Sequence, residues 1–292
     1  MVDTMIVFLI LHYGSQQITE KCVKSILRIR DQISESIKIV IVDNNVEKSD
    51  TIRKNIELKY NGIDCIEILY YKGISSFSAA NNFGYKYIKR KYKPDFLVVT
   101  NNDVIFFQKE FVDIVTQKYK ESGFYIFSPD IININTQEHQ SPLDFKVRSR
   151  GQVRKTILMN KLVLTFFDVF YPLMKIWIRY DRKSQLSRKQ KVDNIRRKNI
   201  IPYGACIVLS AKFINMKEKI FEPETKFFYE EYILAYQCFK EDLLILYDPS
   251  AKVLHGNKLA TKGKFQNDKE QTRFMIKNTL EASKVYKSLI DK

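Results

Sequence analysis

The stretch that most constrains the fold is Leu97–Val104, where an apolar run ends abruptly at Asn101, Asn102 and Asp103. This pattern is typical of a buried strand that ends at a polar edge. In an α/β sheet, ligands bind outside the carboxyl ends of the strands, so Asp103 would face such a crevice. Together with Asn101 it could hold Mg²⁺ or Mn²⁺ against a diphosphate, because these ions prefer oxygen ligands. The alternative is an ordinary Asn-Asn-Asp turn.

Length and charge limit the possibilities further. The chain has 292 residues, 45% of them hydrophobic, which is enough for one large domain or two small ones. Its net charge of +16 favours an acidic partner, and nucleic acid, anionic lipid and phosphorylated ligands all qualify. Four dispersed cysteines predict neither a zinc site nor a disulfide framework, which fits a reducing cytoplasm. The apolar N-terminal run lacks a basic flank and is interpreted as a strand rather than a signal peptide.

The first half of the chain reads as alternating strands and helices. Strands are predicted at Met5–Leu11, Ile37–Val42 and Cys65–Tyr71, with helices at 17–31 and 51–60 between them. The first two strands form a βαβ unit, so the polar residues at their ends would share one sheet edge, where a nucleotide is usually bound.

The segment Lys72–Gly84 is rich in small residues and runs into a helix through Ile88. Such a helix start lets backbone N–H groups approach an anion, which makes a phosphate contact plausible. The segment is neither a P-loop nor a Gly-x-Gly-x-x-Gly, and a structural turn is the alternative.

A basic segment follows at 146–198, with 16 lysines and arginines against three aspartates. Within it, Ile157–Ile178 is mostly apolar, and its polar or helix-bending residues are spaced as one stripe of a helix: Lys161, Thr165, Asp168, Pro172, Lys175 and Arg179. The charges and the proline argue against a membrane span. We expect one or two helices in the membrane interface, with basic residues on anionic headgroups. The alternative is a helical hairpin packed on the domain, or a dimer contact.

The second half offers two further candidates. Glu230 and Glu231 open a predicted helix, either as simple N-terminal acids or with one of them as a general base. Two short strands are expected at 243–247 and 251–255, the second ending on His255, which is either structural or functional. A basic helix is predicted at 269–288.

In this order the segments resemble the family 2 inverting glycosyltransferases of the GT-A fold, particularly the bacterial group that builds rhamnan, capsule and O-antigen chains. The resemblance implies an α/β fold with a Rossmann-like, mostly parallel central sheet, helices on both faces and a basic amphipathic helical insertion. It divides the chain into a nucleotide-sugar half at 1–145, the helical segment at 146–200, an acceptor and catalytic half at 201–265, and a C-terminal helix at 266–292.

The resemblance also implies roles for particular residues. Asp43 would contact the nucleobase, Gly204 and Ala205 would lie near the acceptor, and a divalent metal, Mn²⁺ or Mg²⁺, would bind Asp103 and His255. Glu231 would be the catalytic base, with Glu230 as a rival. The remaining donor-contacting positions are His12, Tyr13, Gly73, Ser78, Asn81, Asn82, Asn101 and Asn102.

Two departures from the family pattern matter. The base position carries Glu231 where an aspartate is usual, and Asn101 replaces the first metal-motif acid, which predicts lower metal affinity. No Gln-x-x-Arg-Trp occurs near the C-terminus, and the single tryptophan is Trp177. A processive synthase of the cellulose or hyaluronan type is therefore not expected.

The implied function is non-processive transfer from a UDP- or dTDP-linked sugar to a lipid-linked glycan acceptor in cell-surface polysaccharide synthesis. The protein would lie in the cytoplasm, peripherally on the inner face of a bacterial plasma membrane, and its apolar helix or its terminal helix could serve a homodimer. Three alternatives stay open: a basic nucleic-acid-binding protein, a nucleotidyltransferase and an inactive glycosyltransferase homologue. Nucleic acid is not the expected partner, because the basic charge is interleaved with an apolar helix.

Overall fold

The computed structural model describes residues 4–31, 36–44, 57–60, 62–73, 76–175, 195–256 and 267–292. Parts of two predicted features, residues 51–56 of a helix and 176–194 of the basic segment, lie outside these ranges. Besides a helix at Phe167–Lys175, the elements are β1 (Met5–His12), α1 (Gln16–Arg30), β2 (Ser36–Asp43), β3 (Ile66–Tyr70), α3 (Phe77–Lys91), β4 (Phe96–Asn101), β5 (Val104–Ile105), α4 (Phe111–Ser122), β6 (Ile126–Asn133), α5 (Arg150–Thr165), β7 (Arg197–Lys198), β8 (Cys206–Ser210), α7 (Ala211–Met216), α8 (Glu230–Lys240), β9 (Ile245–His255) and α9 (Asp268–Ile290).

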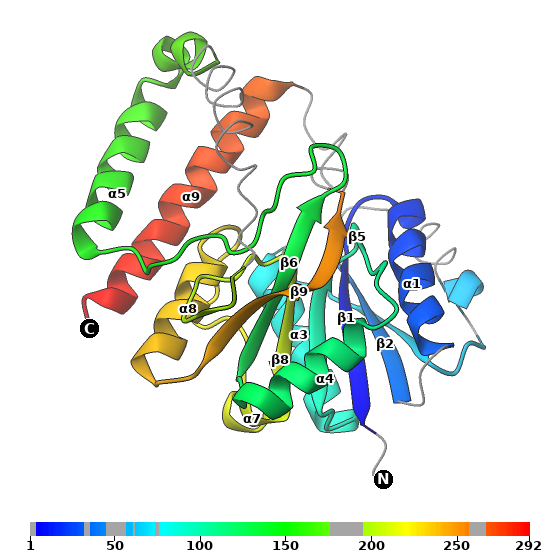
Figure 1. Cartoon of the computed structure of the whole chain (residues 1–292). Coiled ribbons are helices and arrows are strands. Elements are labelled where there is room, and N and C mark those ends of the chain that lie inside the picture. The colour runs from blue at the N-terminus through cyan, green and yellow to red at the C-terminus, as the bar shows by residue number, and fades with distance from the viewer. Residues whose placement is uncertain are drawn as a thin grey trace.

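One mixed sheet runs through the molecule (Figure 1). Its order is β3-β2-β1-β4-β8-β6-β9-β5, and β7 pairs with β9. The first four strands are parallel, as the apolar runs predict. β8 is antiparallel to both β4 and β6, and β6 runs parallel to β9. The mostly parallel central sheet of the expected fold is therefore confirmed.

A hydrophobic core lies on each face of the sheet. Alternate residues of β1 point to opposite sides, so Leu9 packs in the core beneath α3, α8 and α9, whereas Phe8 packs in the core beneath α1 and α4. Both side chains are fully buried. Strands covered on both faces explain why their sequences are continuous apolar runs and do not alternate with polar residues.

Gly84 allows α3 to approach the sheet closely. A Cβ at this position would lie 2.5 Å from Leu9 Cδ1 and 2.7 Å from Val42 Cγ2, so any side chain would push the helix away from β1 and β2. This glycine therefore acts in packing the helix that follows the 72–76 segment.

The two strands expected at 243–247 and 251–255 are instead one strand, β9. It pairs with β6 along its length, and the register shifts between Pro129 and Asp130. This irregularity accommodates the turn-like residues of β9, where the backbone N–H of Ser250 donates to Asp248 Oδ1 over 3.0 Å. Asp248 and Pro249 were predicted as a turn because their local chemistry favours one, whereas pairing with β6 keeps the strand continuous.

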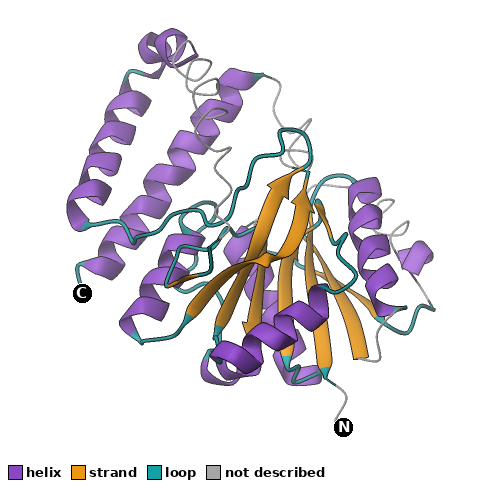
Figure 2. Cartoon of the chain, in the orientation of Figure 1, coloured by secondary structure: helices purple, strands orange, loops and turns teal. Residues whose placement is uncertain are grey.

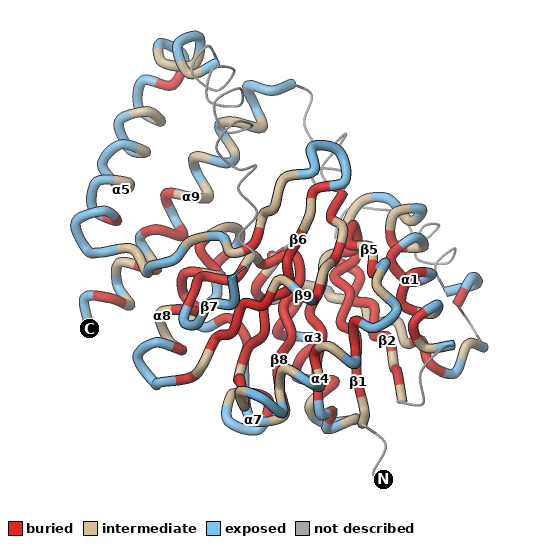
Figure 3. The backbone as a smooth tube through the Cα atoms, in the orientation of Figure 1, coloured by how far each residue is buried: buried red, intermediate tan, exposed pale blue. Residues whose placement is uncertain are grey.

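A helical layer stands beside the sheet, formed by α5, the helix Phe167–Lys175 and α9 (Figure 2). α5 packs along α9, so these two helices lie side by side in one layer. The chain bends by 108° between α5 and Phe167–Lys175, so the predicted single polar stripe is wrong. Among the described residues no single helix is long and apolar enough to cross a membrane, and only this bent pair meets those criteria jointly. Much of the outer surface of α5 is exposed (Figure 3).

Candidate functional site

The polar ends of the parallel strands lie side by side, as the sequence predicts. The register pairs His12 with Asp43 and Leu11 with Asn101, so the carboxyl ends of β1, β2 and β4 meet at one edge of the sheet. Asp43 is 1% exposed and His12 is fully buried. These side chains therefore line a rigid edge of the kind that binds nucleotides in α/β proteins.

The structure brings Asp103 and His255 together across the short pairing of β5 with β9. Val104 pairs with His255, and the backbone N–H of Gly256 donates to the Asp103 carbonyl over 2.8 Å. As a result His255 Nε2 lies 3.2 Å from Asp103 Oδ1, and each residue is 5% exposed. The two residues are 152 positions apart in the chain, and only the sheet pairing brings them into contact.

Gln140 orients the imidazole of His255. Its side-chain oxygen lies 2.8 Å from His255 Nδ1, and this contact holds the ring with Nε2 toward Asp103. Sequence reasoning missed Gln140, which lies in a polar loop without any recognisable pattern.

The Asp103–His255 pair fits a divalent cation. An octahedral Mg²⁺ or Mn²⁺ binds its ligands at about 2.1 Å, so two adjacent ligands lie about 3 Å apart. The 3.2 Å between Oδ1 and Nε2 matches that spacing. Within the described ranges no cluster of three or more His, Cys, Asp or Glu side chains could hold a metal. The chain thus offers two ligands here, which suits an ion that shares its remaining positions with phosphate oxygens and water.

A half-buried carboxylate, Glu231, lies beside Gly204. Its Oε1 accepts the backbone N–H of Gly204 over 3.2 Å, and a Cβ on Gly204 would lie 2.5 Å from the same oxygen. Burial raises the pKa of Glu231. Gly204 was predicted near the acceptor, and the structure adds that only glycine leaves room for this carboxylate.

Tyr203 joins the two halves of the site. Its ring packs edge-on against His255 with centroids 5.8 Å apart. The pKa of its hydroxyl is raised by burial and then by the negative charges of Glu231 and Asp103, so both carboxylates act on this phenol. Sequence reasoning did not select Tyr203, because an aromatic residue before a Gly-Ala pair carries no distinctive signal.

The two adjacent glutamates have different surroundings. Glu230 is 5% exposed; the Thr225 side chain and the backbone of Phe228 and Glu230 hydrogen-bond to its carboxylate, but its Oε2 is buried without a hydrogen-bond partner among the described residues. Burial, followed by the charge of Glu231, raises the pKa of Glu230 well above its ordinary value. Glu230 is thus the buried first residue of α8, whereas Glu231 is the acid that contacts Gly204.

The phosphate contact predicted for the 72–84 segment stays a prediction, and at the start of α3 two backbone N–H groups already have partners within the chain. The N–H of Phe77 donates to the Lys226 carbonyl over 3.0 Å, and the N–H of Ala79 donates to Ser76 Oγ over 3.2 Å. These backbone donors are thus used within the chain. Gly73 lies against the Tyr71 ring, and the two residues after it are outside the described ranges.

Three α3 residues predicted to contact the donor make hydrogen bonds within the chain, to α3 itself or to the 220–225 segment. Ser78 Oγ accepts the Thr225 N–H over 3.3 Å, and Asn81 Nδ2 donates to the carbonyl of Phe77 in the same helix over 3.0 Å. Asn82 uses its whole amide: Nδ2 donates to the Phe221 carbonyl and Glu224 Oε1, and Oδ1 accepts from the N–H groups of Ile220 and Phe221. These contacts hold the 220–225 segment against α3.

His12 and Asn102 stabilise the turn after β1. Both contact Thr19 Oγ1, His12 through Nδ1 at 2.6 Å and Asn102 through Nδ2 at 2.9 Å. Asn102 Nδ2 also donates to the Tyr13 carbonyl over 3.0 Å. These hydrogen bonds hold the carboxyl ends of β1 and β4 together beside Asp103.

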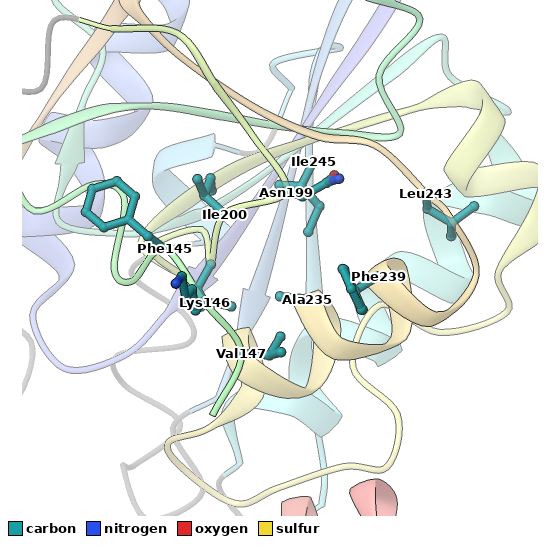
Figure 4. A pocket seen from close by; sticks show the side chains of 10 residues that line it. Phe145, Lys146, Val147, Asn199, Ile200, Ala235, Phe239, Leu243 and Ile245 are labelled. Atoms are coloured by element: carbon teal, nitrogen blue, oxygen red, sulfur yellow. The ribbon is translucent and has the colours of Figure 1, made fainter. Parts of the chain in front are cut away.

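A separate apolar cavity of about 280 Å³ lies behind α8 (Figure 4). The 145–147 segment contributes Phe145 and Val147 to its lining, and α8 with the turn after it contributes Ala235, Phe239 and Leu243. None of the site residues Asp103, His255 and Glu231 lines it. The cavity lies by the beginning of β9, whereas His255 ends that strand, so it is distinct from the candidate site.

Comparison with known proteins supports the resemblance. No family model matches the chain. The curated rhamnosyltransferase WbbL of Escherichia coli (strain K12) is 29% identical over 147 residues, which are 49% of this chain and 50% of that protein. The chain therefore matches about half the length of this relative.

Among solved structures, GalNAc-T7 with UDP, GalNAc and Mn²⁺ aligns at a TM-score of 0.51 and 14% identity, covering 86% of this chain and 43% of that chain. S. aureus TarS 1–349 in complex with UDP aligns at a TM-score of 0.37 and 14% identity, covering 45% of this chain and 37% of that chain, too little to indicate a shared fold. The first alignment confirms the GT-A fold, and the sequence likeness confirms the resemblance to bacterial glycosyltransferases.

Proposed function

We propose that this protein is an inverting glycosyltransferase that uses a nucleotide-sugar donor and a divalent cation. The observation that carries the proposal is the convergence of the Asp103–His255 pair and the Glu231 carboxylate on Tyr203. A pair that could hold a divalent cation and a half-buried carboxylate of raised pKa are groups that would assist displacement of a nucleoside diphosphate.

In this mechanism the nucleotide lies along the edge formed by His12, Asp43 and Asn101. A divalent ion held by Asp103 and His255 would act as a Lewis acid toward the diphosphate. Glu231 accepts the proton of the acceptor hydroxyl, whose oxygen attacks the anomeric carbon. The bond from that carbon to the diphosphate breaks, its electron pair leaves with the nucleoside diphosphate, and a single displacement inverts the anomeric centre.

The test is a panel of UDP- and dTDP-sugars incubated with Mn²⁺ or Mg²⁺ and crude lipid-linked acceptor, with released nucleotide as the readout. We expect release from one donor, lost on chelation and in Asp103→Ala, and lowered about 10²- to 10⁴-fold in Glu231→Gln. Asp103→Ala should also lose Mn²⁺-dependent nucleotide binding, whereas Glu231→Gln should retain it. Pyrophosphate as product would identify a nucleotidyltransferase instead. If the protein neither binds a nucleotide nor releases one from any donor, the proposal is contradicted.

We further propose that the acceptor is a lipid-linked glycan on the cytoplasmic face of a bacterial plasma membrane, in a pathway of cell-surface polysaccharide synthesis. Support comes from an exposed apolar face on α5 and the helix Phe167–Lys175. This face has six side chains that are 43–69% exposed: Leu158, Met159, Leu162, Phe166, Val169 and Leu173. Exposed basic residues on the same helices, Arg154, Lys155, Lys161 and Lys175, complement anionic headgroups.

Sedimentation with phosphatidylglycerol vesicles tests this docking face. The triple variant Leu158→Ser, Leu162→Ser and Val169→Ser should bind vesicles at least tenfold more weakly, because each lost apolar insertion costs about 1–2 kcal/mol. Phe239→Ser is the matched control, since Phe239 is 65% exposed but lies on α8. Equal vesicle binding by the triple variant would contradict the membrane assignment. A dimer in the wild type that the triple variant loses would assign the face to a second copy of the chain.

A further inference from the structure

The backbone just before the two glutamates adopts an unusual conformation. Phe228 and Tyr229 have φ values of 70° and 67°, in the left-handed region that residues with a side chain rarely occupy. Tyr229 is also the N-cap residue of α8, and its side chain does not cap the helix. The left-handed region is unfavourable for residues with a side chain, so other contacts must stabilise this turn.

Arg148 supplies such contacts from a different part of the chain. Its Nη1 donates to the Tyr229 hydroxyl over 2.8 Å, and its Nη2 donates to the Tyr232 hydroxyl over 3.3 Å. The guanidinium carbon also lies 5.2 Å from the Tyr229 ring centre and 4.6 Å from the Tyr232 ring centre. Hydrogen bonds and cation–π contacts from one guanidinium at a partly buried site favour the conformation that makes them, so they help to hold Tyr229 in its left-handed conformation.

The helical layer adds further contacts to Tyr229 and Arg148. Tyr286 of α9 packs against Tyr229 with ring centres 5.7 Å apart, and its hydroxyl donates to the Arg148 carbonyl over 3.3 Å. Arg148 itself directly precedes Ser149, the N-cap of α5. One set of contacts thus joins α5, α9 and the first turn of α8.

We propose that Arg148 is a positioning residue for the carboxylate of Glu231, acting through Tyr229, and so makes the helical layer part of the catalytic apparatus. The inference rests on the proposed role of Glu231 as the base. The backbone conformation of Tyr229 sets where α8 begins, and Glu231 is the second residue of that helix. Its contact with the Gly204 N–H, at 3.2 Å, depends on this starting direction.

The competing explanation is that Arg148 only packs the helical layer onto the domain. Arg150 provides the matched control, because it also joins α5 to α9, donating to the Ile290 carbonyl over 2.8 and 3.0 Å. Its described hydrogen bonds and ion pair reach Ile290 and Asp291 and none reaches α8. A purely structural role would make Arg148→Ala and Arg150→Ala behave alike.

The experiment compares kcat and donor KM of Arg148→Ala, Arg148→Lys, Arg150→Ala and Tyr229→Phe, alone and in a Glu231→Gln background, with thermal unfolding of each variant. We expect Arg148→Ala to lower kcat at least tenfold with donor KM within twofold of wild type, since misplacing a catalytic group by about 1 Å costs up to 100-fold. Arg148→Lys should recover part of the loss, because it restores the charge without the paired donors. Arg150→Ala should stay within twofold of wild-type kcat.

The double variants separate positioning from packing. In the Glu231→Gln background, Arg148→Ala should cause no further loss of kcat, because the group that it positions has already been removed. Additive losses, or equal losses in Arg148→Ala and Arg150→Ala, would overturn the inference.

A second measurement does not depend on activity. In protein labelled with ¹³C-carboxyl glutamate, the NMR titration of Glu231 should move toward that of an ordinary glutamate in Arg148→Ala and stay unchanged in Arg150→Ala. An unchanged titration in Arg148→Ala would refute positioning. A wild type without any transfer activity would instead refute the proposed function, and the NMR comparison would still decide whether Arg148 positions this carboxylate.

Discussion

Replacing Gly204 with alanine tests whether Glu231 must lie where the structure has it. The added Cβ would lie 2.5 Å from Glu231 Oε1, 3.2 Å from Cδ and 3.3 Å from Cγ. Ordinary contact with a Cβ begins at 3.4 Å, so the carboxylate must move by about 1 Å. Gly204 does not have a positive φ, so the change tests side-chain space rather than backbone freedom.

The expected result is a loss of kcat with little change in donor binding. A general base contributes about 10²- to 10⁴-fold to a rate, and a displacement of about 1 Å removes about 100-fold, equivalent to about 2.7 kcal/mol. Nucleotide affinity should stay within twofold of wild type, because Gly204 contacts Glu231 and not the Asp103–His255 pair. The assay is released nucleoside diphosphate under saturating donor, with nucleotide affinity measured by calorimetry.

Gly151→Ala is the matched control, since nothing lies within 4 Å of the Cβ that it would add to α5. That variant should keep wild-type kcat and gain about 0.5–1 kcal/mol of stability, because alanine is the better helix former. If Gly204→Ala retained kcat within twofold of wild type while remaining folded, the assignment of Glu231 as the base would be wrong.

Three further outcomes are expected. Burial and the charge of Glu231 raise the pKa of Glu230, so the protonated carboxyl stabilises the folded state and this stabilisation is lost as pH rises above about 4.5 through the raised pKa. Glutamine does not titrate, so the Tm of Glu230→Gln relative to wild type should increase between about pH 4.5 and 8. A constant Tm difference would contradict the raised pKa. Asn82→Ala should lower the free energy of unfolding in urea by about 2–4 kcal/mol, since it leaves the backbone groups of the 220–221 region unpaired, and a loss below about 0.5 kcal/mol would show that these bonds are dispensable. Gln140→Ala should weaken Mn²⁺ binding in the presence of nucleotide by about tenfold, measured by electron paramagnetic resonance, and unchanged affinity would remove its role in orienting His255.

Much of the fold could be predicted because its signals are local. The runs at Met5–Leu11, Ile37–Val42 and Leu97–Thr100 are apolar because each strand is covered on both faces, and their polar ends mark the ligand edge directly. The fused β9 and the bend after α5 were missed for the opposite reason. In β9, pairing with a neighbouring strand outweighed the local turn preference of Asp248 and Pro249, and an apolar helical pattern does not reveal where a helix bends.

By itself the sequence determined which residues could carry the chemistry: an acid after a buried strand, two acids at a helix start and a histidine at a strand end. Only the tertiary structure decided how these groups combine. The pairing of β5 with β9 brings Asp103 to His255, the absence of a side chain on Gly204 admits Glu231, and Gln140 and Tyr203 join the site without any sequence signal. The physical reason is that each residue's type fixes the chemistry of its side chain, whereas distances between residues far apart in the chain depend on strand register and close packing.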